Sequence, residues 1–220
     1  PYAGGKGLNK VLAAWLYGSY RGYNSDLFAA FIKRISGIVL RGGASGLMAP
    51  FTWMFISSYE DIRKLLTEKN HITSLVRPEY HAFFDSAYVP ICAFTVQHSK
   101  APDKQGVFID LNDFVGADVQ SKYFLEAIRD KSVAWRHQGS STDFHKVPGS
   151  PIAYWLSSRA LSVFEINDPL STFAEPRQGL ITGDNDRFLR QWFETEKDRA
   201  CFGASSRSEA KNCLLYTSLS

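Results

Sequence analysis

The sequence predicts an α/β fold, because short apolar segments of strand length alternate with segments of helical periodicity. Hydrophobic residues make up 45% of the 220 residues and charged residues 21%, which is the balance of a globular chain. The first 100 residues hold only three strand-like segments, fewer than sheets of this class usually contain. The sequence therefore predicts a truncated sheet.

The first expected helix begins at Asn24-Ser25-Asp26, where a side chain can cap it and an acid lies in the first turn. It should end at Gly42-Gly43, where a positive φ costs little. An apolar stripe at helical spacing lies between these points: Leu27, Phe28, Phe31, Ile32, Ile35, Ile38 and Val39. The stripe predicts that one face of the helix is buried.

A second helix is expected after residues 58–61, which approximate a capping box with Asp61 in place of the usual Glu. Its buried face would consist of Ile62, Leu65 and Leu66. Three strands are expected over residues 44–49, 72–76 and 89–96. The third is apolar on both faces, which is typical of a strand covered by helices on both sides, and Pro90 must lie at its first residues.

The character of the chain changes after residue 100. A turn-rich linker over residues 101–106 precedes an expected strand at 106–111 and a short helix at 123–130. Ser150-Pro151 predicts the start of another helix, with Ser as the cap and Pro in the first turn. Its apolar side would comprise Ile152, Trp155, Leu156, Val163 and Phe164. A polar loop is expected at 177–186 and a strand at 188–193.

Several classes of protein are disfavoured by composition. The three cysteines form no CxxC pair and the five histidines are scattered, which argues against a disulfide scaffold and a metal site and suits a reducing cytoplasm. No apolar stretch approaches the ~18 residues of a membrane span. The formal charge of +3 is weakly basic and decides little about a nucleic-acid partner.

Six segments in one order carry a resemblance to a known family: residues 1–2, 25–34, 42–66, 72–97, 148–157 and 175–192. Over residues 1–202 the chain resembles the methyltransferases of the PglX type, which belong to BREX phage-defence systems. The resemblance implies a truncated Rossmann-like methyltransferase sheet that contains the C-terminal strands only. In that fold the strand near residues 90–96 lies between the other two and antiparallel to them.

The same resemblance implies a division into four parts. Residues 1–100 would be the C-terminal half of the catalytic domain, 101–150 a connecting region, and 151–202 the start of a target-recognition domain. Residues 203–220 would be an unstructured, non-native tail, because residues 213–218 look like a translated sequencing adapter. Such a tail should not pack on the preceding domain.

Pro1 and Tyr2 would be the last two residues of an Asn-Pro-Pro-Tyr motif. The exocyclic amine of adenine is a poor nucleophile, because its lone pair is delocalised into the ring. In this family the Asn side chain and a backbone carbonyl accept the hydrogens of the amine, and the aromatic ring stacks on the flipped base. Tyr2 would be that stacking ring; the alternative is an ordinary terminal tyrosine.

Further site residues follow from the resemblance. Phe83 or Phe84 would pack against the flipped base from its other side, unless both only anchor their loop on the core. Asp26 and Phe28 lie in the element near the methyl donor in this family, although a core role also explains them. Four residues of the recognition segment would contact DNA bases or phosphates, unless the segment is only an exposed Gly-rich turn: Arg177, Asn185, Arg187 and Arg190.

The implied activity is transfer of a methyl group from S-adenosylmethionine to adenine in duplex DNA by base flipping, in phage defence. The 220 residues contain no glycine-rich loop for the methionine end of this cofactor, so the fragment is expected to be inactive alone. Expected partners are duplex DNA and other defence proteins, without a membrane, in the cytoplasm. Two alternatives stay open: a DNA-binding specificity subunit that does not catalyse, and a small-molecule or protein methyltransferase of the same fold.

Overall fold

The computed structural model describes residues 7–80, 90–175 and 206. The chain divides into two compact units, residues 1–167 and 168–220. Within the described residues, the first unit contains every strand and the second contains only the 3-10 turn η5 (Leu170–Thr172). The polar loop and the strand expected at 177–193 lie outside the described residues, as does the tail at 203–220 apart from the exposed Ser206.

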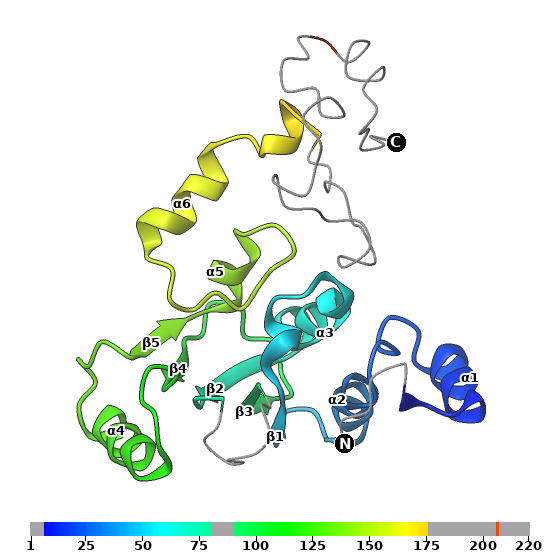
Figure 1. The fold of residues 1–220 in the computed structure, drawn as a ribbon, viewed down its shortest axis with the longest axis horizontal. Helices are drawn as coiled ribbons and strands as arrows, with labels where there is room; N and C mark the ends of the chain where they lie inside the picture. The colour runs from blue at the N-terminus through cyan, green and yellow to red at the C-terminus, as the bar shows by residue number, and fades with distance from the viewer. Residues whose placement is uncertain (1–6, 81–89, 176–205, 207–220) are drawn as a thin grey trace, which may run out of the picture. The chain divides into compact units, whose positions relative to one another are not determined.

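Two helices precede the sheet in the described chain (Figure 1). The first, α1 (Lys10–Ser19), was not predicted; the Asn9 side chain caps it by accepting a hydrogen bond from the amide of Leu12 at 2.8 Å. The second, α2 (Leu27–Ile38), confirms the predicted helix, and Asp26 is its cap. It ends four residues before Gly42, whose φ of +84° instead serves the turn into the sheet.

The segment after the first strand, β1 (Ala44–Pro50), winds through short helical turns. These are η2 (Phe51–Met54), η3 (Ser57–Tyr59), α3 (Glu60–Lys64) and η4 (Leu65–Lys69). The predicted capping box is wrong, because Ser58 lies within η3 and the cap of α3 is Tyr59, without a side-chain hydrogen bond. The predicted buried face of Ile62, Leu65 and Leu66 is confirmed.

The sheet has five strands in the order β1-β3-β2-β4-β5. After β1, its members are β2 (His71–Arg77), β3 (Ile91–Gln97), β4 (Gly106–Asp110) and β5 (Arg136–Gly139). As predicted, β3 lies between β1 and β2 and is antiparallel to both. Pro90 lies just before β3, so its lack of an N–H removes no hydrogen bond from the strand, as the sequence predicted.

The sheet continues beyond residue 100, where the sequence pattern changes and a connecting region was expected. The predicted strand β4 pairs parallel to β2, and β5, which was not predicted, pairs antiparallel to β4. The close approach of β4 requires Gly106, because a Cβ there would overlap the carbonyl oxygen of Ile72. Residues 101–150, expected as a connecting region, therefore supply two strands to the same sheet.

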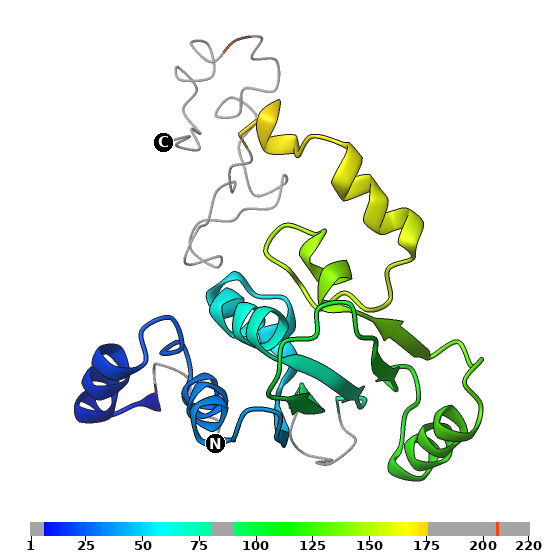
Figure 2. The ribbon, with the colours of Figure 1, turned by 180° about the vertical axis from the view of Figure 1, so that it is seen from behind.

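Hydrophobic cores lie on both faces of the sheet. The larger core packs α2, α3 and α5 (Ser141–His145) against the face that carries Leu75, Phe94 and Phe108. The smaller packs α4 (Ala117–Arg129) against Ile109 and Leu111, and α4 lies apart from α2 and α3 in both views (Figures 1 and 2). The sheet is thus covered unevenly.

The prediction that helices cover both faces of β3 is not met within the described residues. Cys92, Phe94 and Val96 are buried, whereas Thr95 on the opposite face is exposed. The Thr95 hydroxyl is hydrogen-bonded to the hydroxyls of Thr73 and Ser74, so polar pairs replace a second core at this position.

The helix predicted at Ser150-Pro151 begins later. Ser150 has a φ of +49°, which is not the extended conformation of an N-cap, and residues 151–157 are not helical. Instead α6 (Ser158–Ile166) follows Ser157, whose side chain accepts a hydrogen bond from the amide of Ala160 at 3.2 Å. Ile152 is fully buried in the larger core and is not on a helix face.

No helix in the described part of the chain combines the length and the apolar character that crossing a bilayer requires.

Candidate functional site

Three strands end at one edge of the sheet. The register places Pro50, the last residue of β1, beside Ile91, and Arg77, the last residue of β2, beside Asp110, the last of β4. The segment between β2 and β3 therefore leaves and re-enters the sheet at this edge. In open α/β sheets, ligands bind in the crevice outside the carboxyl ends of the strands. This edge is the candidate functional site.

A continuous line of aromatic side chains, here called the aromatic row, borders the edge. It runs through Tyr80, Phe51, Phe55, Trp155 and Tyr154, with ring centroids 5.7, 6.2, 5.5 and 5.0 Å apart in that order. The first members follow β1 and β2 directly, and the last two come from the chain after residue 150. Tilted and edge-on contacts of this kind are favourable for aromatic pairs.

Polar contacts fix one end of the aromatic row. Arg77 forms a two-pronged ion pair with Asp110, at 3.1 Å through Nε and 2.9 Å through its terminal nitrogen. The Tyr154 hydroxyl donates to Asp110 Oδ2 at 3.1 Å, and its ring stacks on Phe108 at 5.1 Å. Burial, followed by the charge of Asp110, raises the pKa of Tyr154 above its ordinary value. The phenol therefore stays a hydrogen-bond donor.

The rest of the row is partly exposed to solvent. Trp155 is 44% exposed, and Phe51, Phe55 and Tyr80 are half-buried. Arg77 also lies over the Phe51 ring, with its guanidinium carbon 5.5 Å from the centroid. Aromatic rings that are fixed in place, partly exposed and next to a cation can stack on planar π systems such as nucleobases.

Sequence reasoning missed the aromatic row. A usable signal was present, because Phe51, Trp53 and Phe55 come directly after a predicted strand, and Tyr154-Trp155 is a pair of aromatics. Neither sequence pattern shows which of these side chains are in contact in the folded chain, since Phe55 and Trp155 are 100 positions apart. The contact is a product of the tertiary fold.

Most of the site residues implied by the resemblance lie outside the described residues: Pro1, Tyr2, Phe83, Phe84, Arg177, Asn185, Arg187 and Arg190. The chain flanking Phe83 and Phe84 is described, and it joins β2 to β3 at the edge that carries the aromatic row. Their roles stay predictions.

Asp26 and Phe28 are both buried, with exposed fractions of 3% and 4%. Asp26 Oδ1 caps α2 by accepting a hydrogen bond from the amide of Phe28 at 3.2 Å. The Phe28 ring packs on Tyr59 at 5.2 Å within the larger core. The structure gives each residue a structural role, and their contact with a cofactor stays a prediction.

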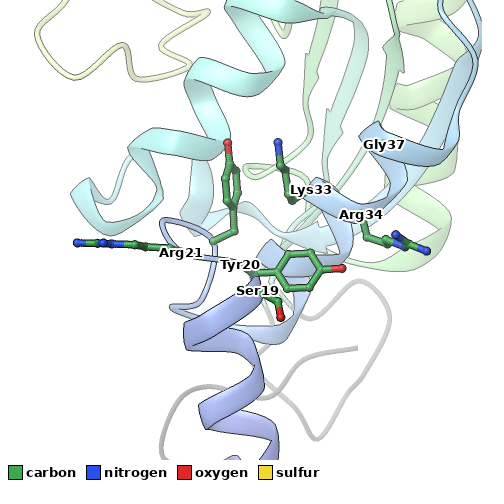
Figure 3. Close-up of a pocket in the computed structure, with 7 residues that line it drawn as sticks. Ser19, Tyr20, Arg21, Lys33, Arg34 and Gly37 are labelled. Carbon is green, nitrogen blue, oxygen red and sulfur yellow. The ribbon is translucent and has the colours of Figure 1, made fainter.

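A hollow of 270 Å³ lies between α1 and α2 (Figure 3). Its lining is rich in cations and tyrosines: Ser19, Tyr20, Arg21, Tyr23, Lys33, Arg34 and Gly37. Lys33 Nζ lies 5.2 Å from the centroid of Tyr23, but Arg21 and Arg34 extend in opposite directions (Figure 3). The cations therefore do not converge on one anion. No group of three or more metal-binding side chains occurs among the described residues.

Comparison with known proteins identifies relatives. A family profile, Eco57I restriction-modification methylase, matches residues 1–84. The chain is 30% identical over 199 residues to the adenine-specific methyltransferase PglX of Lacticaseibacillus casei strain Zhang. It is 29% identical over 197 residues to the adenine-specific methyltransferase BrxX of Escherichia coli O9:H4 strain HS. These matches cover 89% and 88% of this chain and 16% of each relative.

Among solved structures, the chain resembles one described as a modification subunit of a type I restriction enzyme from Vibrio vulnificus YJ016. The TM-score is 0.50 at 12% identity, over 68% of this chain and 36% of the other. This likeness supports the fold, a mixed α/β methyltransferase sheet of which the chain contains a part. Over nearly nine tenths of its length, the chain is similar in sequence to the PglX-type adenine-specific methyltransferases.

Proposed function

We propose that this chain is part of an enzyme that transfers a methyl group from S-adenosylmethionine to the exocyclic amine of adenine in duplex DNA. The chain spans 16% of the curated relatives it matches, so the proposal concerns the longer protein to which these residues would belong. One observation carries it furthest: a partly exposed aromatic row that begins at the carboxyl ends of β1 and β2. Such an edge suits a flipped base.

The target adenine would enter at this edge. Tyr2 would stack on one face of the base, and Phe83 or Phe84 would pack against the other. A base between two rings needs their planes roughly 7 Å apart, since stacking works at about half that distance on each face. The segment carrying Phe83 and Phe84 starts and ends beside Phe51 and Tyr80, which supports a base-binding role.

The methyl donor would be held mainly by residues other than those described. S-adenosylmethionine would supply the electrophilic methyl group. Asp26 and Phe28 are buried and have structural roles within the fold, and their contact with the donor stays a prediction.

Recognition of DNA would fall to the chain after the sheet. Arg177, Arg187 and Arg190 can neutralise phosphates or read guanine, and Asn185 can pair with adenine edges. The similarity to PglX supports a role in phage defence alongside other proteins of such a system.

The test is mass spectrometry of nucleosides from DNA incubated with the full-length protein and S-adenosylmethionine. We expect N6-methyladenine, and no methylcytosine, in duplex DNA. A protein that binds DNA without methylating it would support the alternative, a specificity subunit. Methylation of a small molecule or a protein, but not of DNA, would contradict the proposal as well.

A further inference from the structure

A buried arginine connects the two halves of the aromatic row. Arg63, on α3, is only 2% exposed and is among the largest fully buried side chains of the described chain. Burying a guanidinium is costly unless hydrogen bonds compensate. The groups that accept hydrogen bonds from this guanidinium therefore indicate the role of the buried charge.

All the hydrogen bonds recorded for this guanidinium go to backbone carbonyls. Nη1 donates to the carbonyl oxygens of Trp53 at 2.9 Å and Ile56 at 2.7 Å, and Nε donates to that of Gly149 at 2.9 Å. No described carboxylate lies within ion-pair distance of Arg63, and the nearby Glu60 pairs with Lys64 at 2.8 Å. Burial lowers the pKa of Arg63, opposed by the charge of Glu60.

The three carbonyls belong to two distant segments that both carry ring residues. Trp53 and Ile56 flank Phe55 in the chain, so Nη1 fixes the backbone on both sides of that ring. Gly149 lies in a left-handed turn, with a φ of +77°, six residues before Trp155. A backbone hydrogen bond from Ile152 to the carbonyl of Met54, at 3.0 Å, continues the same connection.

We propose that Arg63 is a positioning residue for the DNA substrate, because its guanidinium holds Phe55 and Trp155 in contact at the base-binding edge. The rings lie 5.5 Å apart, and each is attached to a segment that Arg63 binds. The role in DNA binding rests on the proposed function. Arg63 itself, being buried, touches neither DNA nor cofactor.

Two substitutions separate positioning from folding. Arg63→Lys keeps the charge, but one ammonium group cannot reproduce the planar fork that spans both segments. Arg63→Met keeps the apolar stem and removes the guanidinium hydrogen bonds to all three carbonyls, of which that of Ile56 still accepts from the amide of Tyr59 at 3.1 Å. Arg129→Lys is the matched control, because Arg129 is exposed in the last turn of α4.

In the full-length protein we expect Arg63→Lys to raise the KM for DNA about tenfold, as loss of one charged hydrogen bond would. The KM for S-adenosylmethionine should stay unchanged. A purely structural role would instead lower the active fraction, which reduces kcat at unchanged KM for both substrates. That second pattern, or unchanged kinetics, would overturn the proposal.

A direct readout is the ¹⁹F spectrum of the full-length protein labelled with 5-fluorotryptophan, in which the resonances of Trp155 and Trp135 are assigned by single Trp→Phe substitutions. Arg63→Lys should shift the Trp155 resonance and leave Trp135, in the smaller core, unmoved. An unmoved Trp155 resonance would contradict the proposal. If the wild-type full-length protein methylates no DNA, the proposed function fails, whereas the resonance of Trp155 still decides whether Arg63 positions the ring.

Discussion

At the scale of single residues, histidines with lowered pKa values should make the free energy of unfolding depend on pH. His98 is 7% exposed, and its ring nitrogens lie 2.8 Å from the Ser45 hydroxyl and 3.4 Å from that of Ser36. Burial lowers the pKa of His98 below its ordinary value of 6.5, as it does for His71 and His137. The ring thus joins α2 to β1 in its neutral form.

Stability should therefore fall as the pH drops below 6.5. The unfolded chain takes up a proton there while folded His98 does not, so the contribution of His98 to the free energy of unfolding decreases as the pH falls through 6.5 and is fully present well above it. Each such histidine contributes at most about 1.4 kcal/mol per pH unit. Urea titrations at pH 7.0 and 5.5 measure the difference, and His98→Gln should reduce it. A free energy of unfolding that rises between pH 7.0 and 5.5 would contradict the neutral assignment.

At the scale of elements, replacing either of two glycines by alanine should change the stability of the fold in opposite directions. A Cβ at Gly106 would collide with the backbone of β2, whereas Gly37 in α2 has nothing within 4 Å. We expect Gly106→Ala to destabilise the fold by about 1–3 kcal/mol through overpacking. Gly37→Ala should stabilise it by up to ~1 kcal/mol, since alanine favours helix. Denaturant unfolding of both variants tests this; equal effects would show that β4 does not approach β2 so closely.

At the same scale, the observed helices and strands show which elements sequence patterns could predict. The helix after Asp26 and strands β1 to β3 were predicted, because caps and periodicity are local signals. The strand β5 was missed because Arg136–Gly139 is polar and short and so has no apolar alternation. The helix start at Ser150 was wrong, because its positive φ follows from a turn next to Arg63 that no local pattern reveals.

At the scale of the whole molecule, the sheet positions the site. Antiparallel β3 returns the chain so that β1, β2 and β4 end together, and residues from three distant segments form the aromatic row. The resemblance predicted the order of the first three strands but not this row, since the contact between its two halves joins Phe55 to Trp155, a hundred positions apart. Tyr2, Phe83 and Phe84 would complete this surface.

The most direct measurement of this account is the rate of methyl transfer by the full-length protein with Tyr2→Ala, on duplex DNA. Loss of stacking worth about 1–3 kcal/mol should lower kcat/KM for DNA by roughly 5-fold to 150-fold, while the affinity for S-adenosylmethionine stays nearly unchanged. Tyr2→Phe, which keeps the ring, should retain most of the activity. Undiminished methylation by Tyr2→Ala would contradict the claim that a flipped adenine binds at this edge.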